Sequence, residues 1–189
     1  MSFLGNLPFD EKDFPTLQLI KQDYGFIPNF FLAQTMRPDL IDAEVQLVDA
    51  LLIREGALTR RQKEYIFLVC SAANLSTYCV TAHCEIVRML RLEGPEPEQI
   101  ALDHTASNLP IVDKALLNFA VKLNNHPLTI SQADIDTLRT YDFTDQAILE
   151  AVSCVGLAKW ANYIGFGLGT VPDFKTLQLD LSNSVAANA

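Results

Sequence analysis

A short stretch near the middle of the chain, NLSTYCVTAHCE at residues 74–85, contains a hydroxyl, a thiol and an imidazole at Ser76, Cys79 and His83. On an α-helix these three side chains fall within about 60° of one another. If Ser76 caps the helix, Cys79 is its third residue, where free backbone N–H groups and the helix dipole favour a thiolate. The spacing therefore predicts an acidic cysteine with an imidazole one turn behind it.

A carboxylate on the preceding segment completes this group. Glu64 belongs to a helical pattern that we expect to break between residues 73 and 76. In an antiparallel hairpin of two helices, Glu64 would fold back beside Cys79 and His83. It would there orient the imidazole or accept a proton through water, so the three residues have the parts of a proton relay to a nucleophilic sulfur.

The other cysteines and the possibility of a metal need separate treatment. Cys70 and Cys154 each adjoin valine and are expected to be buried structural residues. Cys84 lies about 140° around the helix from Cys79 and some 8–9 Å away at Cα, beyond a relaxed disulfide. The possible ligands in 79–85 diverge around the helix and no second cluster exists, so we expect no metal and no cofactor.

Composition restricts the class of partner. The chain has 189 residues, 49% of them apolar, and a net charge of −9, so neither nucleic acid nor an anionic membrane is an expected partner. The amino terminus lacks a secretory signal, and the apolar stretch 147–171 is interrupted by Glu150 and Lys159. Four irregularly spaced cysteines suit a reducing compartment. We expect a cytoplasmic protein that shares apolar surface as a homo-oligomer.

Helical periodicity dominates the chain. Apolar stripes predict one long helix from about residue 40 to Gly56 and another from 112 to just before Pro127. Thr59-x-x-Gln62 and Ser131-x-x-Asp134 have the form of capping boxes at helix starts. We predict a single all-α domain of roughly eight helices over residues 1–175, followed by a carboxyl-terminal tail at 176–189.

The chain also contains a weak internal pseudo-repeat. Glu64 is followed after twelve residues by Ser76, and Glu150 is followed at the same offset by Asn162. The positions of Cys79 and His83 are glycines in the second copy. The repeat is mild support for a doubled helical core in which only the first copy has reactive groups.

These residues resemble the signature of a known family. Glu64-x11-Ser76-x2-Cys79-x3-His83 is similar to the Glu-x11-Cys-x2-Cys-x3-His motif of alkylhydroperoxidase D-like, or carboxymuconolactone decarboxylase-like, proteins. AANLSTYCVTAH resembles the peroxidase-related subgroup. The segments YGFIPNFF, ALLNFAVKLNNHP, DIDTLRTYDFTDQAILEAV and ANYIGFGLG extend the resemblance over about nine-tenths of the chain.

The resemblance implies an all-α fold, assembled as a dimer, trimer or hexamer. It also implies reduction of hydrogen peroxide or organic hydroperoxides by cysteine, without metal or haem. Cys79 would attack the peroxide oxygen and become a sulfenic acid, with His83 and Glu64 as its proton relay. The expected partners are a hydroperoxide substrate and an external thiol reductant.

Ser76 departs from the family motif, because it stands where the first cysteine normally forms a disulfide with the second. That exchange cannot occur with a serine. Three outcomes follow: a single-cysteine peroxidase rescued by an external thiol, a resolving role for Cys84, Cys70 or Cys154, or loss of peroxidase activity. The functional alternatives are a lyase acting on a small lactone acid, with His83 as its acid or base, and a non-enzymatic redox-sensing or ligand-binding oligomer.

Overall fold

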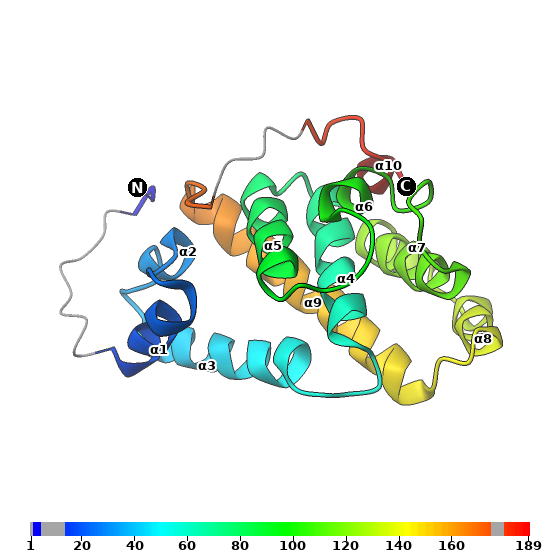
Figure 1. Ribbon diagram of the computed structural model, residues 1–189, viewed down its shortest axis with the longest axis horizontal. Coiled ribbons are helices and arrows are strands. Elements are labelled where there is room, and N and C mark those ends of the chain that lie inside the picture. Colours follow the sequence, from blue (N-terminus) through cyan, green and yellow to red (C-terminus); the bar gives the residue numbers. More distant parts are fainter. Residues whose placement is uncertain (1, 5–13, 175–179) are drawn as a thin grey trace.

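The computed structural model describes residues 2–4, 14–174 and 180–189 and confirms the all-α prediction, with no strand in these residues. Figure 1 shows the arrangement. The elements are α1 (Pro15–Tyr24), α2 (Asn29–Leu32), α3 (Pro38–Val48), the π-helical turn η2 (Asp49–Ile53), α4 (Arg60–Ala73), α5 (Thr77–Met89), α6 (Pro97–Asp103), α7 (Ile111–Asn125), the 3₁₀ turn η3 (Pro127–Thr129), α8 (Gln132–Thr140), α9 (Asp145–Leu168) and α10 (Val185–Asn188).

Helix α4 is the centre of the core. Every residue from Lys63 to Ala72 is buried, and α4 packs against α5, α6, α7 and α9 (Figure 1). Helix α5 folds back along α4 after a tight turn in which Leu75 has a left-handed φ of 59° and the Ser76 N–H bonds to the Ser71 carbonyl at 2.8 Å. The predicted break therefore occurs where expected, and it places Glu64 on the helix beside the reactive stretch.

The first three helices lie together at one side of this bundle (Figure 1). Leu17, Ile20 and Ile41 form a small core of their own between α1 and α3. Helix α3 continues directly into η2, so the predicted long helix exists but its last turn is π-helical. A π-helical turn changes the direction of the following side chains. Leu52 and Ile53 of this turn reach the cavity described below.

Capping boxes fix two helix starts, as predicted. At α4 the Thr59 hydroxyl accepts from the Gln62 N–H at 3.2 Å, and the Gln62 side chain accepts from the Thr59 N–H at 3.0 Å. The second box, between Ser131 and Asp134, begins α8. Each box satisfies backbone donors that the helix itself leaves free.

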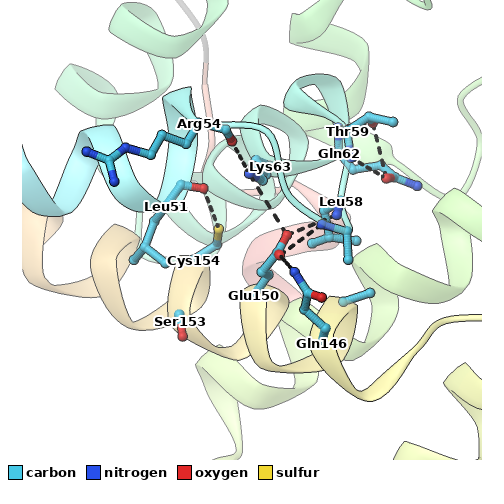
Figure 2. Close-up of polar contacts among 12 residues, drawn as sticks. Leu51, Arg54, Leu58, Thr59, Gln62, Lys63, Gln146, Glu150, Ser153 and Cys154 are labelled. Atoms are coloured by element: carbon cyan, nitrogen blue, oxygen red, sulfur yellow. Dashed lines mark hydrogen bonds and ion pairs between the residues drawn. The ribbon is translucent and has the colours of Figure 1, made fainter.

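A polar clasp from α9 holds the loop that leads into α4 (Figure 2). The Glu150 carboxylate accepts from the N–H groups of Ala57 and Leu58, each at 2.9 Å. Lys63 is 2% exposed, and its ammonium donates to the Arg54 carbonyl at 2.8 Å and lies 3.9 Å from Glu150. The clasp therefore sets the start of the helix that presents Glu64.

The pseudo-repeat is not reproduced in the helices. The first copy breaks between α4 and α5, whereas α9 runs without interruption through Asn162 and ends at Leu168. Asn162 is fully buried and its amide meets the first copy, as described below.

The proposed boundary between domain and tail, at 175 and 176, lies outside the described residues. The described part of the predicted tail, 180–189, packs on the bundle: α10 lies against α4 and α6, and Leu181 and Ala186 are buried. Among the described helices, none combines the length and apolar character that a membrane span requires.

Candidate active site

The structure brings three of the predicted site residues around one cavity. Cys79 and His83 of α5 and Glu64 of α4 all line a cavity of about 120 Å³ between the first three helices and the α4–α5 hairpin. The remaining wall is mainly apolar and aromatic, and includes Tyr24, Phe30, Phe31, Val48, Leu52, Phe67, Tyr78, Ile86, Leu157 and Phe174. Apolar cavities of about 150 Å³ bind benzene, so this space suits a small apolar ligand.

Glu64 and His83 form a buried pair. The His83 Nδ1 lies 2.6 Å from Glu64 Oε2, and Arg60 Nε donates to Glu64 Oε1 at 2.7 Å. Burial raises the pKa of Glu64, but the charges and hydrogen bonds of His83 and Arg60 outweigh it and hold that pKa below its ordinary value. The imidazole also stacks on Phe67, with 4.3 Å between ring centroids. Because Nδ1 is held by Glu64, proton exchange with a ligand falls to Nε2.

Cys79 is the third residue of α5, as predicted, but its thiol is not acidic. The residue is 4% exposed, and burial raises the pKa of the thiol above its ordinary value. Hydrogen bonds with the Ser76 hydroxyl and the Asn162 amide offset part of this rise, and the Glu44 charge adds to it. The prediction of an acidic cysteine is therefore wrong in this structure, because desolvation outweighs the hydrogen bonds that favour the thiolate.

Ser76 also differs from the prediction. It occupies the N-cap position of α5, but its side chain makes no capping hydrogen bond. Ser76 is 2% exposed, and a hydrogen bond from its side chain lowers the pKa of the Cys79 thiol. Ser76 thus acts on the thiol rather than on the helix end.

Sequence reasoning missed a cluster of three asparagines behind Cys79, of which Asn124 and Asn162 are buried. The Asn74 amide donates to Asn162 Oδ1 at 2.8 Å, and Asn74 exchanges hydrogen bonds with Asn124 at 3.1 and 2.9 Å. Asn162 donates in turn to the Ser71 hydroxyl at 3.0 Å. Asn162 occupies the repeat position of Ser76, so the pseudo-repeat was the one signal that could have identified it. The second copy supplies a polar contact to the site.

Glu44 is a second carboxyl group in the cavity, and it too was missed. It lies on α3, is 5% exposed, and its Oε2 accepts from the Gln34 amide at 3.1 Å. Burial raises the pKa of Glu44 to about 7, and the Gln34 hydrogen bond opposes that rise. In the sequence, Glu44 is visible only as an acidic residue inside an apolar helical stripe.

Aromatic residues close the cavity at the side of the amino-terminal turn. Tyr78 Oη accepts from the Phe30 N–H at 3.2 Å and donates to Asp173 Oδ1 at 3.2 Å. The ring of Phe174 packs edge-on against Tyr78 and Tyr24, with 6.4 Å between centroids in each pair. Through Phe30 the turn GFIPNFF, residues 25–31, is therefore joined to Tyr78 of α5, which in turn contacts Asp173 and Phe174.

The remaining thiols lie apart from the cavity. Cys70, Cys84 and Cys154 are each 0% exposed, and all four cysteines are free. Burial raises the pKa of Cys84 and of Cys154 to about 12. Of the four, only Cys79 is among the described residues that line the cavity.

Comparison with known proteins places the fold. No family profile and no curated protein matches the chain. A solved structure of an uncharacterised peroxidase-related protein with an alkylhydroperoxidase AhpD core, from Ralstonia eutropha JMP134, is similar with a TM-score of 0.84 and 27% identity over 91% of this chain and 92% of that one.

Two further structures share the fold. A peroxidase-related protein from Silicibacter sp. TM1040 has a TM-score of 0.81 and 23% identity over 88% of this chain and 87% of its own. The debrominase Bmp8, in complex with 2,3,4-tribromopyrrole, has a TM-score of 0.77 and 20% identity over 92% and 94%. The chain has the alkylhydroperoxidase D-like fold.

Proposed function

We propose that this chain, alkylhydroperoxidase D-like in fold, is a cysteine-dependent peroxidase of the peroxidase-related subgroup. The observation that supports this most strongly is the meeting of Cys79, His83 and Glu64 at one apolar cavity. A thiol that shares a small cavity with an imidazole, itself hydrogen-bonded to a carboxylate, has the groups that peroxide reduction by a single sulfur uses.

The reaction begins at the Cys79 thiol. Its proton passes to His83 Nε2, and Glu64 stabilises the imidazolium through Nδ1, 2.6 Å away. The sulfur attacks the terminal peroxide oxygen, so an S–O bond forms and the O–O bond breaks. Cys79 becomes a sulfenic acid, and the remaining oxygen leaves as an alcohol or water after taking a proton.

Ser76 and Asn162 suit this step because they supply hydrogen bonds to the sulfur in an otherwise desolvated place. They lower the cost of forming a thiolate there. A thiol with a raised pKa is protonated at neutral pH, so the reaction depends on the relay removing its proton as the sulfur attacks.

Regeneration needs an external thiol reductant. Ser76 cannot form a disulfide, and the other three cysteines are buried away from the cavity. Two thiols of the reductant convert the sulfenic acid back to Cys79, with formation of a disulfide and water.

We also propose a homo-oligomer and a single functional domain over residues 1–175.

The lyase alternative fits the cavity less well. A lactone acid carries a carboxylate that needs a cationic partner. Arg60 and His83, the groups of the described cavity wall that carry or can gain positive charge, both bind Glu64. Glu44 adds a second acidic group. An anion would therefore be poorly accommodated.

The aromatic wall favours one second candidate, reduction of a halogenated ring. The structural neighbour Bmp8 is a debrominase seen with 2,3,4-tribromopyrrole. In such a reaction the ring carbon would take a proton and bromine would leave as bromide, while two thiols become a disulfide. Release of bromide from this compound in the presence of dithiothreitol would distinguish this activity from peroxide reduction.

The test of the peroxidase proposal is Cys79→Ser. We expect the parent protein to consume cumene hydroperoxide with dithiothreitol as reductant, and Cys79 to be trapped as a dimedone adduct by mass spectrometry. Cys79→Ser should lose both signals, whereas Cys84→Ser, which removes a buried thiol outside the cavity, should keep them. Equal peroxide consumption by Cys79→Ser would exclude the proposal. One slow oxidation of Cys79 without turnover would favour the redox-sensing alternative.

A further inference from the structure

The cavity contains two buried carboxyl groups, and the proposed relay uses only one of them. Glu64 binds His83 and Arg60 and is held ionised by their charges. Glu44 lies on another wall of the same cavity and has no cationic partner among the described residues. The two acids are therefore in opposite electrostatic environments.

The position of Glu44 is fixed by Gln34. The Gln34 amide group donates to Glu44 Oε2 at 3.1 Å and to the Phe30 carbonyl at 3.2 Å, which ties the pair to α2. Among the described residues no group binds the other oxygen of Glu44, although the side chain is 5% exposed and lines the cavity. One carboxyl oxygen is thus left for a ligand.

The charges around the cavity favour different protonation states for Glu44 and Glu64. The titratable or charged groups that share the cavity with Glu44 are Tyr24, Arg60, Glu64, Tyr78, Cys79 and His83. Arg60 and His83 are both paired with Glu64, so Glu44 gains little from them, and burial favours the neutral form of Glu44. Two carboxyl groups whose environments differ in this way commonly divide the acid and base roles of one reaction.

Peroxide reduction requires such an acid. When the O–O bond breaks, an alkyl hydroperoxide leaves an alkoxide, which is strongly basic and must be protonated. In the proposed step His83 and Glu64 already accept the proton of the Cys79 thiol, so a different group is needed to protonate the leaving oxygen. Glu44 and Cys79 both line the same small cavity. A ligand oxygen attacked by Cys79 would therefore lie in the space that Glu44 faces.

We propose that Glu44, held by Gln34, is the general acid that protonates the leaving oxygen of the hydroperoxide. This inference depends on the peroxidase function proposed above. The Cys79 sulfur forms its bond to the terminal oxygen, the O–O bond breaks, and the proton of Glu44 passes to the departing oxygen. The thiol proton moves to His83, and solvent later returns a proton to Glu44. The products are the Cys79 sulfenic acid and an alcohol.

The experiment compares two oxidants that differ in their leaving group. Cumene hydroperoxide leaves an alkoxide, whereas peracetic acid leaves acetate, which is stable without a proton at neutral pH. In Glu44→Gln we expect the ratio of kcat/KM for cumene hydroperoxide to that for peracetic acid to fall at least tenfold, because general acid catalysis typically contributes 10²–10⁴-fold. Rapid-mixing measurement of Cys79 oxidation gives both values without the reductant step.

Controls separate this role from a structural one. Glu93→Gln removes an exposed carboxylate outside the cavity and should leave the ratio as in the parent. If Glu44→Gln does not fold, Glu44→Met, which keeps a chain of similar length, serves for the same measurement. If the variant keeps the parent's ratio, either because neither rate changes or because both fall by the same factor, Glu44 is not the general acid. The peroxidase proposal would not be affected by that result. A parent that oxidises Cys79 with neither compound would overturn the peroxidase proposal and this inference with it.

Discussion

The raised pKa of Glu44 makes a prediction about stability that does not depend on activity. In the folded protein this pKa is about 7, whereas the ordinary value is 4.5. Between these values the folded protein keeps a proton on Glu44 that the unfolded chain loses, so the contribution of Glu44 to stability falls as pH rises from about 4.5 to 7. The difference of about 2.5 in pKa corresponds to about 3 kcal/mol, because each pKa unit is worth about 1.4 kcal/mol.

Glu44→Gln removes this titration while keeping the shape and the hydrogen-bonding capacity of the side chain. We expect the variant and the parent to have a similar pH dependence of stability below pH 4.5. Above pH 7 the variant should be more stable by up to about 3 kcal/mol relative to that baseline. For a chain of this size such a gain raises Tm by roughly 6–12 °C.

The assay is urea unfolding followed by circular dichroism at fixed protein concentration, in steps from pH 4.5 to 8.5. Glu93→Gln, with its exposed side chain, is the matched control and should follow the parent throughout. A stability difference between Glu44→Gln and parent that is constant from pH 4.5 to 8.5 would falsify the reasoning, since it would mean that Glu44 ionises alike in the folded and unfolded chains.

Three further predictions follow from other contacts. Glu64→Gln leaves Arg60 and His83 without the charge they bind, so the free energy of unfolding should fall by about 3 kcal/mol at pH 7. This loss of stability should shrink as pH falls through the depressed pKa of Glu64. Urea unfolding of variant and parent at pH 7 and at pH 3 measures it, and an equal loss at both pH values would contradict the reasoning. Glu150→Ala frees two backbone N–H groups of the loop before α4 and should cost about 1–2 kcal/mol; an unchanged urea midpoint would show the clasp to be dispensable. Tyr163→Glu puts a charge on the exposed apolar face of α9, so light scattering should report a smaller assembly than the parent, and an equal mass would remove this face from the proposed oligomer.

The hairpin of α4 and α5 shows how far local sequence reaches. The apolar periodicity, the capping box at Thr59 and the break before Ser76 are all written in consecutive residues, and the structure confirms each of them. A helical period fixes which side chains share a face, so the placement of Cys79 and His83 one turn apart was predictable. Once the two helices fold back, Glu64 meets His83 as expected.

The protonation of the site was not predictable in the same way. The helix terminus at Cys79 is a local feature that favours a thiolate. Burial of the thiol is not local, and it raises the pKa of Cys79. Glu44 and Asn162 reach the site from α3 and α9, far from the motif in sequence. No spacing rule within one helix can identify such neighbours.

The sequence by itself therefore determined the helices, the hairpin and the motif that carries the proposed chemistry, because these depend on residues within a few turns of one another. Only the tertiary structure decided how far the Cys79 thiol is removed from solvent, which carboxyl group is ionised and which is neutral, and what shape the cavity has. Those properties depend on desolvation and on charges brought together from separate helices, and both arise only when the helices pack. The tertiary structure also turned Ser76 from an expected helix cap into a partner of the sulfur.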